Sequence, residues 1–68
     1  MSRVPDPQRY RLTLTFDGRP VMRGWWPDEA VARGQHTRWV GDWGRPGARV
    51  VLVDEESGSV LTTWPDDA

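Results

Sequence analysis

The sequence predicts an α+β fold of the order ββαββ, in which a four-stranded antiparallel sheet carries one helix packed on one of its faces. Three observations lead to this prediction. Residues 10–16 alternate between apolar and polar side chains, as in a half-buried strand. Residues 28–43 place apolar side chains at helical spacing. Residues 49–64 contain two runs rich in Val and Thr on either side of a turn.

The chain has 68 residues, which is enough for one small domain. Residues 1–8 hold two prolines in polar surroundings and are expected to form a disordered leader. Residues 65–68 are expected to form a short acidic tail. Residues 9–64 then make a single α+β domain, whose small core depends on every large apolar side chain.

The first hairpin is predicted from YRLTLTF, residues 10–16, followed by the turn DGRP and a return strand over residues 21–26. Trp25 and Trp26 are neighbours on this return strand, so they must point to opposite faces of the sheet. A three-residue loop would place Met22 and Trp26 on the core face, whereas a two-residue loop would place Val21 and Trp25 there. We favour the first register, because the second would also turn Arg23 into the core.

A helix is predicted from Asp28, which suits an N-cap, to about Trp43, where the sequence GRPG ends it. The side chains that share its apolar face are Ala32, His36, Trp39, Val40 and Trp43.

The second hairpin is predicted from strands over residues 49–54 and 60–64, joined by a turn over EESG. If Asp54 lies opposite Ser59, Leu52 and Leu61 face the helix. The core expected beneath the helix is then Tyr10, Leu12, Leu14, Phe16, Met22, Trp26, Val50, Leu52 and Leu61. Trp64 falls on the opposite, open face of the sheet.

This open face is the predicted working surface, because it is too apolar to be left in contact with water alone. Its expected apolar members are Val21, Trp25, Val51, Val53, Val60 and Trp64. Trp and Arg are the residues most enriched at interaction hot spots. The predicted partner-binding residues are Trp25, Trp64, Arg23, Arg11, Val51, Val53 and Arg49. They indicate a protein-interaction module that docks on another protein or on a second copy of itself, as a homodimer.

Single-stranded nucleic-acid binding is the alternative function for the same Arg and Trp face, since bases stack on aromatic rings and guanidinium groups bind phosphates. The net charge of −1 makes this alternative weaker, because phosphate neutralisation supplies much of the affinity of such proteins. A third interpretation is that the chain termini or a turn fold back over the tryptophans, which would make them ordinary packing residues.

Other chemistry finds little support in the sequence. The chain has no cysteine and one histidine, His36, so no zinc or thiolate site is expected, and His36 has no partners at the spacing of a catalytic triad. We therefore expect no enzymatic activity, metal or cofactor. Without an apolar run long enough to span a bilayer, no membrane association is expected, and the lack of cysteine suits the cytoplasm.

The pieces YRLTLTFDGRPVMRGWW, RWVGDWG and ARVVLVDEESGSVLTTWP together resemble a family of short Trp-rich proteins from high-GC bacteria. The complete replacement of Lys by Arg and the absence of Ile and Asn are consistent with a GC-rich genome. The resemblance covers nearly the whole chain past residue 9, and it implies no particular activity.

Overall fold

A computed structural model of the chain describes residues 9–65. The predicted leader, residues 1–8, lies outside these residues, and so does the predicted acidic tail apart from Pro65. The elements are β1 (Tyr10–Phe16), β2 (Arg19–Trp26), α1 (Glu29–Trp43), β3 (Ala48–Asp54) and β4 (Ser59–Trp64). The predicted ββαββ order and α+β class are confirmed.

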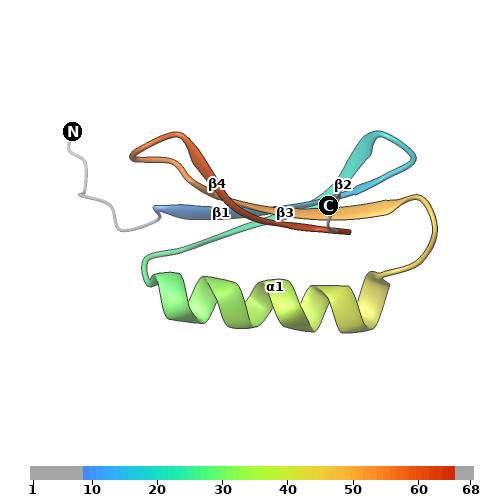
Figure 1. Ribbon diagram of the computed structural model, residues 1–68, viewed down its shortest axis with the longest axis horizontal. Helices are drawn as coiled ribbons and strands as arrows, with labels where there is room; N and C mark the ends of the chain where they lie inside the picture. Colours follow the sequence, from blue (N-terminus) through green and yellow to red (C-terminus); the bar gives the residue numbers. More distant parts are fainter. Residues whose placement is uncertain (1–8, 66–68) are drawn as a thin grey trace.

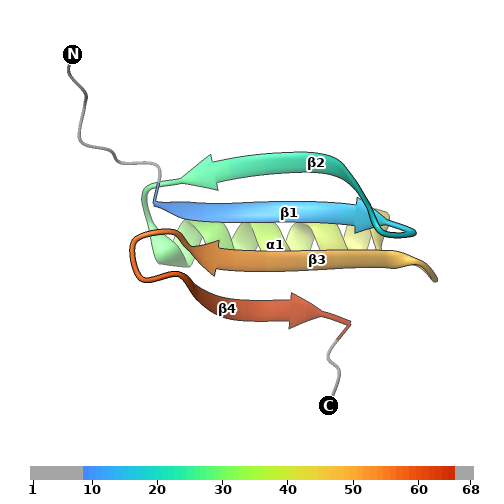
Figure 2. The ribbon, with the colours of Figure 1, turned by 90° about the horizontal axis from the view of Figure 1, so that it is seen from above.

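The four strands form one antiparallel sheet in the order β2-β1-β3-β4, and α1 covers one of its two faces (Figures 1 and 2). The two central strands belong to different hairpins, so the pairing of β1 with β3 joins the halves of the chain. The other face of the sheet is covered by none of the described residues (Figure 1). β2 and β4 are the edge strands.

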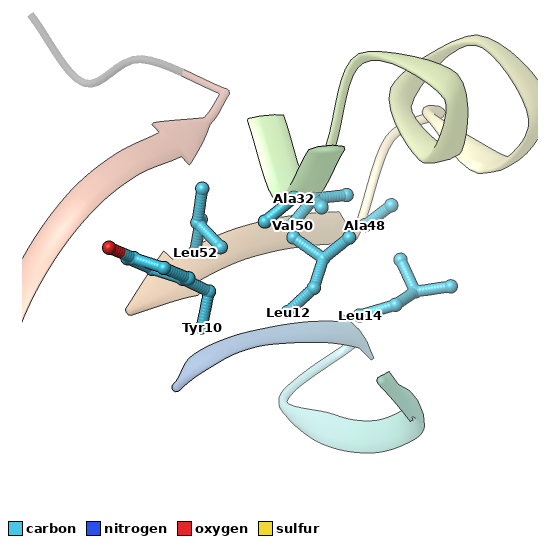
Figure 3. Packing of buried hydrophobic residues seen from close by; sticks show 7 residues of the cluster. All are labelled: Tyr10, Leu12, Leu14, Ala32, Ala48, Val50 and Leu52. Atoms are coloured by element: carbon cyan, nitrogen blue, oxygen red, sulfur yellow. The ribbon is translucent and has the colours of Figure 1, made fainter. Parts of the chain in front are cut away.

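The core lies between the central strands and the helix (Figure 3). Leu12 and Leu52 face each other across β1 and β3 and are fully buried, as is Val50. The other buried apolar residues are Tyr10, Leu14, Ala32 and Ala48, and the side chains packed around them are Met22, Trp26, Trp39, Val40, Leu61 and Trp64. Of the predicted core, only Phe16 is exposed.

The first hairpin confirms that Trp26 is the inward tryptophan and Trp25 the outward one, but not the loop from which this was inferred. Phe16 pairs with Arg19, so the loop has two residues, Asp17 and Gly18, both with positive φ. A β-bulge at Val21 then adds one residue to β2. The bulge shifts the register and brings Met22 opposite Leu14 on the core face.

The second hairpin shows that the predicted position of Trp64 is wrong. Asp54 does pair with Ser59, but a register shift follows between Val53 and Leu52, and it places Trp64 opposite the buried Val50. The extra residue moves the end of β4 to the other face. Trp64 therefore packs against the core on the helix side of the sheet, near Gly44.

The helix begins and ends where the sequence predicts. The Asp28 carboxylate accepts a hydrogen bond from the Ala30 N–H at 2.8 Å, as an N-cap does, and the Gly44 N–H donates to the Val40 carbonyl. The chain then reaches β3 through Gly47, whose positive φ suits glycine. The Gly47 carbonyl accepts the Asp17 N–H at 2.9 Å, which ties the tip of the first hairpin to this connection.

Candidate functional site

The open face of the sheet is organised in rows that cross the strands. Trp25 of β2, Arg11 of β1 and Val53 of β3 lie side by side in register, and Val60 of β4 continues the row. Trp25 is 42% exposed and Val60 is 60% exposed, while Val53 between them is half-buried. The row is therefore an apolar strip across the whole sheet with one guanidinium group in it.

A second row runs beside the first and contains Arg23, Thr13, Val51 and Thr63. Arg49 follows in the next row, opposite Thr15. The structure thus brings six of the seven predicted site residues onto one face, namely Trp25, Arg11, Arg23, Val51, Val53 and Arg49. Trp64 is the exception, because the bulge in β4 directs it to the helix side.

Glu55, in the turn after β3, fixes the polar groups of the first row. One of its carboxylate oxygens binds Arg11 Nη1 at 2.8 Å, and the other accepts the Trp25 indole N–H at 3.3 Å. Arg11 Nε is buried and has no hydrogen-bond partner among the described residues. The indole ring is therefore held over the sheet by a hydrogen bond at one edge, with Arg11 beside it.

Arg9, next to β1, is bound by the carboxylate of Asp54. Arg9 Nε and Nη2 donate to the two oxygens of Asp54 at 2.8 and 2.7 Å, and Nη1 pairs with Glu56 at 2.9 Å. Asp54 also accepts the Glu56 N–H at 3.0 Å. The fork from Arg9 holds the pKa of the Asp54 carboxyl well below its usual range.

The arginines of the described chain fall into two groups. Arg9, Arg11, Arg33 and Arg38 each pair with a carboxylate. Within residues 9–65, no ion pair forms at the other four, which are Arg19, Arg23, Arg45 and Arg49. Three of these four lie around the end of the sheet where β1 finishes at Phe16, and Arg23 lies on the open face.

A cavity of about 210 Å³ opens at this same end, between the first hairpin and the C-terminus of α1. Its lining residues are Leu14, Phe16, Val21, Trp43 and Arg45. Three of them, Phe16, Val21 and Trp43, are large apolar side chains exposed to solvent. The Arg45 guanidinium lies 5.6 Å from the centre of the Phe16 ring, close enough for a cation–π contact.

Sequence reasoning missed this cavity. The alternation along β1 predicts Phe16 as a core residue, and the helical spacing places Trp43 on the apolar face of the helix. The pattern of β2 places Val21 on the open face. The bulge at Val21 and the end of α1 at Trp43 are what leave these side chains uncovered. The signal in the sequence that bears on it is the pair of turn sequences DGRP and GRPG, which lie far apart in the chain and which the fold brings together.

His36 is a packing residue by its surroundings. It is buried between helix and sheet, and its Nε2 lies 3.2 Å from the Val50 carbonyl, which fits an Nε2–H donor. Burial lowers the pKa of His36, and the positive charge of Arg33 lowers it further, against the favourable contact with Val50. Residues 9–65 contain no cluster of three or more His, Asp or Glu side chains that could hold a metal ion.

α1, the helix of the described chain, is too short and too polar to cross a bilayer. Comparisons with protein-family models, with curated proteins and with solved structures find no match to this chain.

Proposed function

We propose that this protein is a small, non-enzymatic interaction module that binds another protein through the open face of its sheet. The observation that carries the proposal is the row Trp25, Arg11, Val53 and Val60, an apolar strip that crosses all four strands and that no described residue covers. A small protein that leaves such a strip in water usually covers it with a partner.

The composition of the face supports a binding role. Trp25 offers a large rigid surface whose indole is already oriented by Glu55, so little side-chain entropy is lost when a partner packs on it. The valines at its side and the threonines of the second row supply a flat, weakly polar surround. An apolar centre with polar neighbours is the usual anatomy of a protein interface.

A different protein is a better partner for this face than a second copy of the chain. Arg23 and Arg49 lie on the open face without an ion-pair partner among residues 9–65. Two identical faces packed together would bury these like charges in one interface, which is unfavourable. A partner whose surface supplies carboxylates would neutralise them.

Single-stranded nucleic acid is the alternative ligand of this face, favoured by the same two arginines and the exposed indole. Glu55 makes nucleic-acid binding less favourable, because its carboxylate already binds the Arg11 guanidinium and accepts a hydrogen bond from the Trp25 indole. A phosphate approaching Arg11 would meet a negative charge there. We therefore place protein binding first.

The proposal is tested by affinity capture of the tagged full chain from lysate of its own host, with and without nuclease. The variants Trp25→Ser and Val60→Asp remove opposite ends of the apolar strip. Val31→Asp is the matched control, since Val31 is an exposed valine on the helix, away from the open face. A stoichiometric protein that survives nuclease and is lost from both strip variants, but not from the control, supports the proposal.

Three outcomes would count against it. If recovery of the partner disappears after nuclease treatment, the open face binds nucleic acid. A short oligothymidylate should then quench the tryptophan fluorescence, and this quenching should weaken steeply as the salt concentration rises. If the partner is recovered equally with the wild type, Trp25→Ser and Val60→Asp, the open face is not where the partner binds. A dimer that dissociates on Val60→Asp in analytical ultracentrifugation would restore self-association as the function.

A further inference from the structure

The cavity at the Phe16 end is a second site, separate from the apolar strip of the open face. It lies between β1–β2 and the end of α1, and its walls are the side chains of Phe16, Val21 and Trp43, with the buried Leu14 among the lining residues. A hollow of about 210 Å³ with such walls can hold one large aliphatic or aromatic side chain. Arg45 is the single charged residue of the lining.

The backbone holds the cavity open. The bulge at Val21 bends β2, and both turns of the sheet curve away from the helix (Figure 1). At the same time, the hydrogen bond from Asp17 N–H to the Gly47 carbonyl fixes the hairpin tip against the connection that follows α1. The bulge and this hydrogen bond therefore fix the backbone on both sides of the opening.

The edge strand β2 borders two hollows. A second depression is lined by Pro20, Val21, Met22, Arg23 and Trp25, and it shares Val21 with the cavity. Together the two follow β2, which is an edge strand. An elongated depression beside an edge strand fits an extended polypeptide better than a compact small molecule, because successive side chains of a peptide can enter neighbouring hollows.

The charge around the cavity indicates what that polypeptide carries. Arg45 at the cavity, Arg19 at the start of β2 and Arg23 in the second depression form no ion pair within the described chain. The nearby carboxylates are Asp17, which lies against Gly47, and Asp42, which pairs with Arg38 at 3.9 Å. The positive charges near the cavity outnumber these carboxylates, so the carboxylates of a binding partner would neutralise them.

We propose that this cavity binds an acidic polypeptide segment of a partner protein, with one large apolar side chain inserted among Phe16, Val21 and Trp43. A carboxylate next to that side chain pairs with Arg45. Further acidic residues meet Arg19 and Arg23 as the segment follows β2. The inference goes beyond the open-face proposal, because it places the anchoring apolar side chain in the cavity at Phe16, Val21 and Trp43, outside the apolar strip; Arg23 is shared with the open face.

A peptide library displayed on phage and panned against the immobilised full chain tests this. We expect enriched peptides to contain Asp or Glu beside Leu, Phe or Trp. The affinity of a synthetic copy of one enriched peptide is then measured by calorimetry for four variants. Val21→Asp and Arg45→Gln alter the cavity. Val60→Asp and Arg33→Gln are their matched controls, with Val60 60% exposed and Val21 61% exposed on the two edge strands, and Arg33 paired with Glu29 in the first part of α1.

Val21→Asp should weaken binding by about tenfold or more, because it removes an apolar wall and repels carboxylates. Arg45→Gln should weaken it by about fivefold, with a smaller dependence on salt than the wild type shows. Both controls should bind as the wild type does. This pattern would support the cavity as the site.

Other patterns overturn the inference, and they separate it from the open-face proposal. Peptides that Val60→Asp loses but Val21→Asp retains bind the open face, which would support that proposal and sink this one. Enriched peptides without acidic residues, or equal binding to all four variants, would also sink it. Competition by oligothymidylates that grows with their number of phosphates would show that the cavity region binds anions in general and is not a polypeptide site.

Discussion

The two ends of the sheet differ in how many of their charged and apolar side chains find partners within residues 9–65. At the end where β3 finishes at Asp54, the arginines have carboxylate partners. Arg9 binds Asp54 and Glu56, and Arg11 binds Glu55. At the end where β1 finishes at Phe16, Arg19, Arg45 and Arg49 have none among residues 9–65. Charge is neutralised at one end and left open at the other.

On the helix side of the sheet, the apolar side chains divide in the same way. Near the Asp54 end, Tyr10 is buried, and Trp26 packs edge-to-face on Trp39 with their ring centres 6.0 Å apart. Near the Phe16 end, Phe16 and Trp43 are exposed around a cavity. The same residue types therefore hold one end closed and leave the other end with unmet contacts. The proposed polypeptide site at the Phe16 end rests on this difference.

The largest effect is expected from Trp64, which covers the Phe16 end on the β4 side. Trp64→Ser should lower the free energy of unfolding by about 3 kcal/mol, because a large side chain packed against the core is lost. Trp25→Ser, on the open face, should lower it by less than about 1 kcal/mol. Urea unfolding followed by circular dichroism measures both. Equal effects would mean that the two tryptophans are buried alike.

Gly24→Ala should disturb the closed end. A Cβ at Gly24 would lie 2.5 Å from the Trp26 ring, so the ring must move away from Trp39. We expect a loss of about 1–3 kcal/mol, typical of overpacking. Gly34→Ala is the control. A Cβ there meets no heavy atom within 4 Å, and Ala favours the helix by about 1 kcal/mol. Thermal melts that show both variants stabilised would refute the close packing at Gly24.

Asp54→Asn and Arg45→Gln compare the charges of the two ends directly. Asp54→Asn should lower the melting temperature at pH 7, since the fork to Arg9 is lost, and by less than Gly24→Ala does. Arg45→Gln should change stability by no more than about 0.5 kcal/mol.

The pH dependence of the same two variants gives an independent check. Asp54 has a lowered pKa in the folded chain, so its contribution is present above the ordinary carboxyl pKa of about 4 and is lost as the pH falls further. The melting temperature of wild type and Arg45→Gln should decline steeply below that pH. Asp54→Asn should decline less, and an unchanged slope would contradict the ion pair.

The smallest effect is expected from His36, midway between the ends. Burial lowers its pKa in the folded chain, so its contribution is complete above about pH 6.5 and is lost as the pH falls toward the lowered value. The melting temperature should therefore fall slightly between pH 7 and pH 5 in the wild type. In His36→Gln, where no group titrates at this position, that part of the decline should be absent.

The sequence by itself determined which segments are strands and helix, and that Trp25 and Trp26 point to opposite faces of the sheet. These are local properties. Side-chain period separates strand from helix, Asp28 caps the helix, and Asp17–Gly18 adopts the positive φ of a tight turn. The open face followed from them, together with most of its residues.

The tertiary structure decided the strand order, the position of Trp64 and the cavity at the Phe16 end. Each depends on which residues lie opposite one another, and the bulges at Val21 in β2 and at Leu61 in β4 shift that register by one. A shift of one residue transfers every following side chain to the other face. Alternation along a strand cannot indicate such a shift, because the bulge is set by packing across the sheet, where Trp64 reaches Val50 and Met22 reaches Leu14.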